Sequence, residues 1–375
     1  MPKERPARNA FDALVVLAVL IASVWVIPAG LTGRPWAIAL PSRSSTSAAA
    51  SSTSTAPATA STKKGSGVTP VSTPAPNRPH GPVVAVTDLG GFDEGIAFGA
   101  GSLWAASGSR LLRIDPATNK VSAEIPIEPN GSGAAGVAFG AGAVWVPVAM
   151  PAALWRIDPA KNRVVAKIPL GTNLDGTVSV SATDGAVWLA SEDHSGSRAA
   201  GLLTHVDPAH NRVAGRVRAA GVPTSIAATS RAVWAATVSD GIVVIDARKN
   251  QVVKTLALAS SLGYAQTVVA AAGAVWLADP FDQQVLRVDP ATMNVVARIP
   301  AGAVTGLTAD SAGVVWAATP DGILRIDPRH HQVTVSSAVP VADLDDVLLL
   351  TSGGNALWAG RTASVAHLDP KRIQP

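Results

Sequence analysis

A tryptophan that returns seven times at nearly constant intervals is the feature that most limits how this chain can fold. The successive intervals are 41, 43, 46, 42, 40 and 42 residues. Repeats of this length are typical of the blades of a β-propeller. The tryptophans are Trp104, Trp145, Trp188, Trp234, Trp276, Trp316 and Trp358. Each is followed by an aspartate that usually opens an Asp-Pro turn: Asp115, Asp158, Asp207, Asp246, Asp289, Asp327 and Asp369.

Each repeat carries the signals of four short strands. Residues 95–127 read GIAFGAGSLWAASGSRLLRIDPATNKVSAEIPI, in which four apolar runs alternate with Gly-rich or Asp-Pro turns. In the turn DPATN, the aspartate can cap the turn, Pro116 presets φ, and Asn119 tolerates a left-handed backbone. We therefore predict an all-β fold over residues 83–375, a seven-bladed β-propeller of four-stranded antiparallel blades.

The last repeat stops after its third strand, which would leave an unpaired sheet edge. Residues 83–91 (VVAVTDLGG) match the pattern of a fourth strand, as in VVAKIPLGT at residues 164–172. We expect residues 83–89 to pair with the strand at residues 363–368 and to close the ring. Such closure removes open edges that otherwise promote aggregation.

The N-terminal region differs from the repeats. Residues 13–31 run 19 positions without a charge, close to the roughly 20 apolar residues that span a bilayer. Because Lys3, Arg5 and Arg8 precede them, we predict a transmembrane signal-anchor helix at residues 13–31, with residues 1–12 in the cytoplasm. The alternative is a signal peptide cleaved after Ala39. Either interpretation puts the propeller on the extracytoplasmic side, at the cell membrane or secreted.

Residues 32–82 are rich in Ser, Thr, Ala and Pro, a composition that predicts a disordered stalk. Residues 1–82 carry eight Lys or Arg against two acids, whereas residues 83–375 carry 22 against 24. The basic excess therefore belongs to the N-terminal region, and we do not expect nucleic acid as a partner. The absence of cysteine excludes disulfides, thiolate metal sites and thiol catalysis.

The blade formula, V-W followed by small residues, then R-I-D-P-A-x-N-x-V and I-P-x-G, resembles the YVTN-type (YncE-like) propellers over residues 83–375. In outline the chain is also similar to streptogramin (virginiamycin B) lyase. That resemblance implies a seven-bladed ring and, for the lyase, a metal near a catalytic histidine and glutamates late in the ring. The lyase-type signature Trp-Phe-Thr-Glu is replaced here by sequences such as WAAS and WLAD. We therefore transfer no catalytic residue.

The acidic residues gather in loops that should share one rim of the ring. If the strands run outward from a central channel, the loops between second and third strands lie on the same rim as the connections between blades. An acidic rim can concentrate cations, amines or a basic partner surface. Ten residues of this rim are our candidates for ligand or partner binding: Glu192, Asp193, His194, Asp240, Tyr264, Asp279, Phe281, Asp282, Asp321 and Asp345.

Two functional hypotheses follow. The first is a non-catalytic module that binds a partner protein, a cell-envelope polymer or a small ligand through the acidic rim, with no evident cofactor. The second is a metal-dependent lyase or hydrolase that uses a divalent cation. It would use His194 with Glu192 and Asp193, at the head of a long loop over residues 191–201, together with acids from other blades. Solvated polar loops are the alternative to both.

Overall fold

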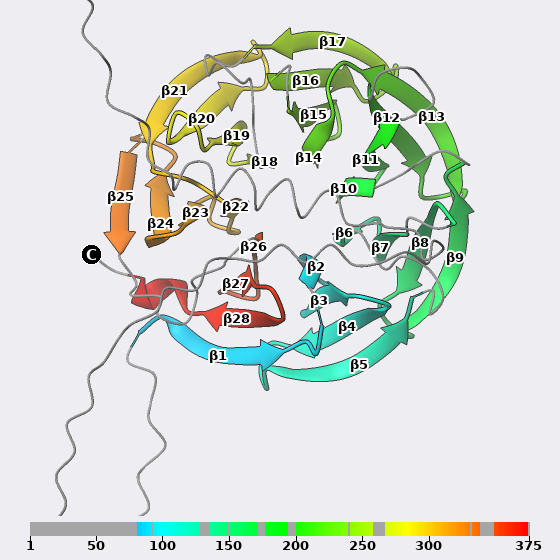
Figure 1. Cartoon of the computed structure of the whole chain (residues 1–375), viewed down its shortest axis with the longest axis horizontal. Coiled ribbons are helices and arrows are strands. Elements are labelled where there is room, and N and C mark those ends of the chain that lie inside the picture. The colour runs from blue at the N-terminus through cyan, green and yellow to red at the C-terminus, as the bar shows by residue number, and fades with distance from the viewer. Residues whose placement is uncertain are drawn as a thin grey trace, which may run out of the picture. The chain divides into compact units, whose positions relative to one another are not determined.

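The computed structural model describes residues 81–91, 93–127, 136–148, 151–171, 177–193, 200–238, 241–257, 267–330, 332–337 and 349–373. In this part of the chain, seven four-stranded antiparallel sheets stand around a central axis (Figure 1). The predicted all-β, seven-bladed propeller is confirmed. The predicted transmembrane helix and residues 32–80 of the predicted stalk lie outside the described residues. None of the helices within the described ranges has the length and hydropathy to span a bilayer.

The first strand of each blade is the one nearest the axis, and the second strand follows it outward (Figure 1). The first strands are β2 (Asp93–Gly99), β6 (Ala138–Gly140), β10 (Thr177–Ala182), β14 (Pro223–Ala228), β18 (Val268–Ala271), β22 (Gly306–Ala309) and β26 (Leu349–Gly353). The second strands are β3 (Ser102–Ser107), β7 (Ala143–Val148), β11 (Val187–Asp193), β15 (Ala232–Thr237), β19 (Ala274–Asp279), β23 (Val315–Thr319) and β27 (Ala356–Gly360).

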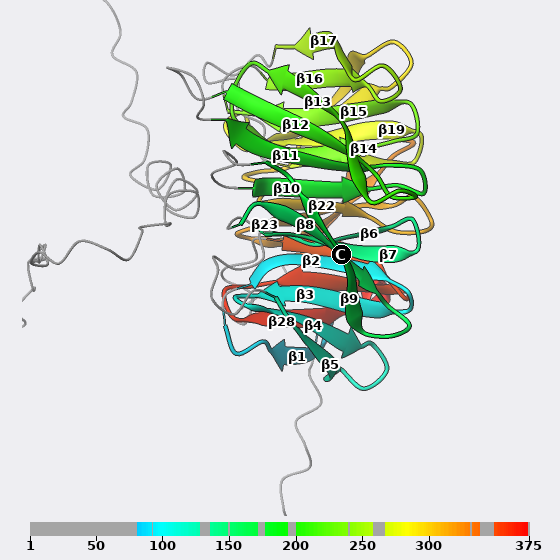
Figure 2. The same ribbon diagram turned by 90° about the vertical axis from the view of Figure 1, so that its right-hand side faces the viewer.

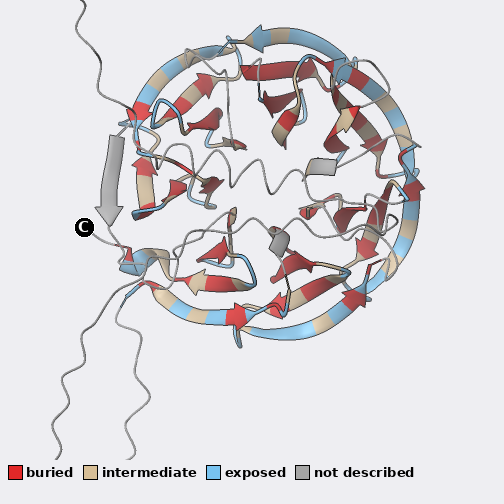
Figure 3. Cartoon of the chain, viewed as in Figure 1, coloured by how far each residue is buried: buried red, intermediate tan, exposed pale blue. Residues whose placement is uncertain are grey.

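The third and fourth strands complete each blade toward the outside, and exposed residues are frequent on the fourth strands whose burial is described (Figure 3). The third strands are β4 (Arg110–Asp115), β8 (Ala153–Asp158), β12 (Ala200–Asp207), β16 (Gly241–Asp246), β20 (Gln284–Asp289), β24 (Gly322–Asp327) and β28 (Ser364–Leu368). The fourth strands are β5 (Lys120–Pro126), β9 (Arg163–Pro169), β13 (Arg212–Ala219), β17 (Gln251–Leu256), β21 (Asn294–Pro300), β25 (Gln332–Ser337) and β1 (Val83–Asp88). A 3-10 turn, η1 (Pro370–Arg372), follows β28.

The ring closes as the sequence predicts. Strand β1 supplies the fourth strand of the last blade and pairs antiparallel with β28, with Val86 opposite Ala366. The amide of Leu89 donates to the carbonyl of Ala363 at 2.9 Å, which extends the pairing beyond the strand itself. The first and last segments of the propeller therefore share one sheet.

The repeated tryptophans are packed between blades, and their exposed fractions are 0% except for Trp316 at 2%. The indole of Trp104 donates to the carbonyl of Gly99 at 3.0 Å, five residues back in the hairpin. Blades 2, 5 and 7 repeat this bond, to Gly140, Ala271 and Gly353. The indole N–H groups of Trp188 and Trp234 are buried and have no partner within the described ranges. The seven repeated tryptophans therefore have a structural role, as their position on the second strands predicts.

In blades 1, 2, 3 and 7, the residue two positions before the turn aspartate forms a hydrogen bond to the next blade. The guanidinium of Arg113 lies 5.2 Å from the centroid of the Trp104 ring and donates to Asn162 Oδ1 in the next blade at 2.8 Å. The turn asparagines have positive φ, as predicted, and this conformation accompanies the contact. The same link recurs as Arg156 to Asn211 and His205 to Asn250, both at 2.9 Å.

His367 carries this link across the closing seam. Its ring stacks on Trp358 with the centroids 4.3 Å apart, and its Nδ1 lies 2.6 Å from Asn119 Oδ1 in the first blade. Thr87 of β1 also donates to the carbonyl of Asn119, at 2.9 Å. Burial lowers the pKa of His367, although Asp369 nearby acts in the opposite direction. The seam therefore favours neutral His367.

We expect the propeller to lose stability as the pH falls below about 6.5, because the unfolded chain then binds a proton that folded His367 resists. The contribution of His367 is fully present above that pH and decreases as the histidine is protonated. Thermal unfolding between pH 5 and 8 measures it. The substitution His367→Arg installs the residue that blades 1 and 2 use, and it should flatten the pH dependence. An equally steep dependence in that variant would contradict the assignment.

Candidate functional site

The candidate residues that the structure describes lie on the rim formed by the loops from second to third strands and by the connections between blades; we call this the acidic rim. The Asp-Pro turns occupy the opposite rim, because neighbouring strands run in opposite directions; Figure 2 gives a side view of the ring. His194, Asp240, Tyr264 and Asp345 lie outside the described residues. The six described candidates are Glu192, Asp193, Asp279, Phe281, Asp282 and Asp321.

Asp193 is built into the sheet and is not at the head of a loop. The predicted loop over residues 191–201 is shorter than expected, because β11 continues to Asp193, which pairs with Ala200 of β12. The side chain of Asp193 is 7% exposed, and its Oδ2 lies 2.5 Å from Nη2 of Arg218 on β13. Glu192 is half-buried beside it. The carboxylate of Asp193 is therefore held by a guanidinium, which competes with any cation at this position.

Asp279 is fully buried at the end of β19 and holds the turn that follows. Its Oδ1 accepts from the amide of Asp282 at 3.3 Å, and its Oδ2 accepts from Nε2 of Gln284 at 3.1 Å. The same Gln284 amide lies 3.4 Å from Asp282 Oδ2. Burial raises the pKa of Asp279 against the opposing effect of these hydrogen bonds. The buried Asp279 carboxylate therefore fixes the turn over residues 280–283 through these hydrogen bonds.

The same turn presents an aromatic side chain and a carboxylate outward. Phe281 is 37% exposed and stands between Pro280 and the exposed Asp282. In the next blade the exposed Asp321 occupies the corresponding loop between β23 and β24. The structure thus gathers Asp279, Phe281 and Asp282 in one turn, with Asp279 as its buried support and the other two at the surface.

In five blades, the residue three positions after the tryptophan carries a short polar side chain that is buried or half-buried, a feature that we did not predict from the sequence. Ser107, Ser191, Thr237 and Thr319 occupy this position, and each hydroxyl donates to a backbone carbonyl at 3.0–3.3 Å. Asp279 is the member of this series in blade 5. The signal was present in the sequence as the last letter of WAAS, WLAS, WAAT and WLAD. These side chains stabilise the rim hairpins and explain why Asp279 points inward.

On the opposite rim, several turn aspartates are bonded to a basic side chain three residues later in the same turn. His330 Nδ1 lies 2.7 Å from Asp327 Oδ2, and this bond, with the turn amides, lowers the pKa of Asp327 to about 2. The pKa of Asp158 is lowered by its bond to Lys161, and that of Asp207 by its bond to His210. These aspartates cap Asp-Pro turns, as the sequence predicts. These aspartates therefore stabilise the turns.

The described part of the acidic rim presents carboxylates and one exposed aromatic ring. Within the described ranges, no three His, Asp or Glu side chains come close enough to hold a metal ion. The acids that sit deepest, Asp193 and Asp279, are engaged by Arg218 and by Gln284. The metal hypothesis includes His194, which lies outside those ranges and stays a prediction.

The fold assigns the chain to the seven-bladed β-propellers. No known family model matches the sequence, and no curated protein matches it either. The seven-bladed ring that the resemblance implies is confirmed, and the kinship with YncE-like proteins or streptogramin lyase stays a prediction.

Proposed function

We propose that this chain is a non-catalytic binding module that engages a partner protein with a basic surface through its acidic rim. The turn over Asp279, Phe281 and Asp282 carries this proposal. It combines an exposed aromatic ring and an exposed carboxylate on a backbone fixed from below by two hydrogen bonds. Aromatic anchors on rigid supports bind partners at a low entropic cost.

The charges on either side support a basic partner. Asp282 and Asp321 are exposed in successive blades, so their potentials add over the rim between them. Electrostatic complementarity of this kind raises association rates and selects partners more than it adds affinity. A cell-envelope polymer that carries amines would present the same chemistry.

The proposal includes the location. The uncharged segment at residues 13–31 and the stalk at residues 32–82 would hold the propeller outside the cytoplasm, at the membrane. The blade formula R-I-D-P-A-x-N-x-V supports kinship with YncE-like propellers as part of the same proposal.

Site-specific photo-crosslinking tests the binding face. A benzophenone amino acid placed at Phe281 in cells that produce the full chain should give a discrete adduct. The same group at Val296, which is 45% exposed on β21, serves as the control. The double substitution Asp282→Lys and Asp321→Lys should remove the adduct, because it reverses the charge beside the aromatic anchor. Equal adducts from positions 281 and 296, or none, would contradict the proposal. So would substrate turnover by the purified chain.

A further inference from the structure

One tryptophan departs from the sevenfold pattern. Trp155 lies three residues before the turn aspartate of blade 2, on β8, and is 4% exposed. It stands opposite Lys167 of β9, whose Nζ lies 3.7 Å from the centroid of its ring. The other blades place smaller residues at this position: Leu112, Thr204, Val243, Leu286, Leu324 and Ala366. The repeat does not require an indole here, so its presence is specific to this blade.

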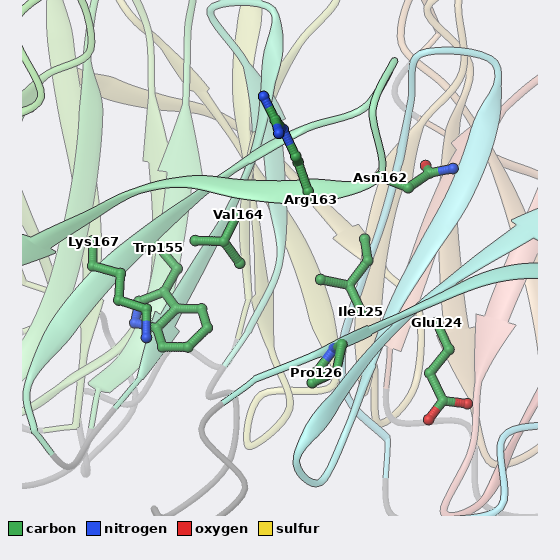
Figure 4. A pocket seen from close by; sticks show the side chains of 8 residues that line it. All are labelled: Glu124, Ile125, Pro126, Trp155, Asn162, Arg163, Val164 and Lys167. Carbon is green, nitrogen blue, oxygen red and sulfur yellow. The ribbon is translucent and has the colours of Figure 1, made fainter.

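Trp155 belongs to a groove of about 510 Å³ on the outside of the ring, between the first and second blades. Figure 4 shows Trp155 and Lys167 together at one end of the groove and Glu124 at the other. The apolar side chains between them are Ile125, Pro126 and Val164. Glu124 lies 3.4 Å from Arg110, which offsets its charge. The groove is therefore apolar in its middle part, with an ammonium at the Trp155 end and the polar side chains of Asn162 and Arg163 also in its lining.

The outer wall beside the groove is basic. Strands β9 and β13 contain five Lys or Arg residues and no acid. Arg216 donates to the carbonyl of Leu170 and Arg218 to Asp193, whereas Arg163 lines the groove itself and is exposed. This wall has the sign of charge opposite to that of the acidic rim, so the two surfaces select different partners.

The groove runs beside the last strands of two sheets. β5 and β9 each end their sheet in the strand order, so their outer edges carry backbone amide and carbonyl groups that no other blade strand pairs. A peptide can use such groups, because its main chain adds hydrogen bonds to an edge strand while alternate side chains enter pockets. This favours a peptide over a polysaccharide as the occupant.

We propose that the groove binds an extended acidic peptide segment of a partner protein. An aliphatic side chain of the peptide packs against Ile125 and Val164, and a carboxylate pairs with Lys167. That pairing draws the Lys167 ammonium away from the face of Trp155, which changes the environment of the indole. A second carboxylate along the peptide pairs with Arg163.

Fluorine NMR on the full chain tests this proposal. The chain contains 10 tryptophans, and incorporation of 5-fluorotryptophan gives each its own resonance. The substitution Trp155→Phe identifies the resonance of Trp155. The probe is the capped hexapeptide DLDLDL, and its charge-reversed analogue is KLKLKL. We expect the acidic peptide to shift the Trp155 resonance in a saturable, salt-sensitive way, and the basic peptide to leave it in place.

Lys167→Glu should raise the dissociation constant of the acidic peptide about tenfold or more. Arg298→Glu is the matched control, because Arg298 occupies the equivalent position in blade 5, opposite Leu286. Unchanged resonances of the other tryptophans verify folding in both variants. A Trp155 resonance that ignores the acidic peptide would overturn the proposal, as would equal weakening by the two variants or equal binding of the basic peptide at Trp155. Binding of the basic peptide that leaves the Trp155 resonance unchanged would be attributed to the acidic rim and would agree with the proposal for the groove.

Discussion

Replacing Gly99 with alanine is expected to lower the free energy of unfolding by about 1–3 kcal/mol. A Cβ at this position would lie 2.0 Å from Cγ and 2.4 Å from Cδ1 of Phe139 in the next blade. Non-bonded carbon atoms do not approach each other that closely, so the side chain of Phe139 or the inner strands of blades 1 and 2 must shift. Denaturant unfolding of the purified chain, monitored by tryptophan fluorescence, measures the loss.

Gly185→Ala provides the matched control, because a Cβ there meets nothing within 4 Å. Its effect should stay within about 0.5 kcal/mol. Combining Gly99→Ala with Phe139→Ala removes the clash, so the double variant should be more stable than the sum of the two single losses predicts. Strict additivity would show that the two residues do not press on each other.

Deleting residues 83–88 is expected to abolish cooperative folding of the propeller. Without β1, the last blade keeps three strands, and the paired edge of β28, from Ser364 to Leu368, faces solvent. The bond from Thr87 to the carbonyl of Asn119 is lost as well. Unpaired edges of this kind recruit other chains, so aggregation should accompany the loss. Thermal unfolding and size-exclusion chromatography measure both effects.

The control for this deletion removes six residues at positions 51–56, which shortens the chain equally and leaves β1 in place. That variant should melt within about 2 °C of the parent. If the chain without β1 also melted cooperatively within that range and stayed monomeric, the seam would not be what holds the ring closed.

The ring was predictable because its determinants recur. Seven tryptophans fix the number of blades, and the turn aspartates and asparagines fix where the third strand ends and the fourth begins. The match between residues 83–91 and 164–172 revealed the closing strand. The contacts between blades were harder to predict from the sequence. The partnership of Arg113 with Asn162 joins residues 49 positions apart, and only the geometry of adjacent sheets brings them together.

The candidate site was less predictable, because sequence position on a rim does not reveal burial. Asp279 and Asp282 are three residues apart and look alike in the sequence, yet the first is buried and the second is exposed. Asp193 was expected in a loop, but two extra pairs lengthen its hairpin and bring it to Arg218. The groove at Trp155 is lined by residues of two different blades. No periodicity in the sequence predicts which of them come together.

The pairing of β1 with β28 has a consequence for how the protein is made. β1 is synthesised before all seven tryptophans, and its partner Ala366 lies nearly at the end of the chain. At about 5–20 residues per second, roughly 15–60 s pass between them. Throughout that interval the valines of β1 have no ladder to join; Val84 and Val86 remain 37% and 49% exposed even in the finished ring. The first strand of the propeller to be synthesised is thus the last to pair, and the nascent protein is most prone to mispairing during the interval before β28 is complete.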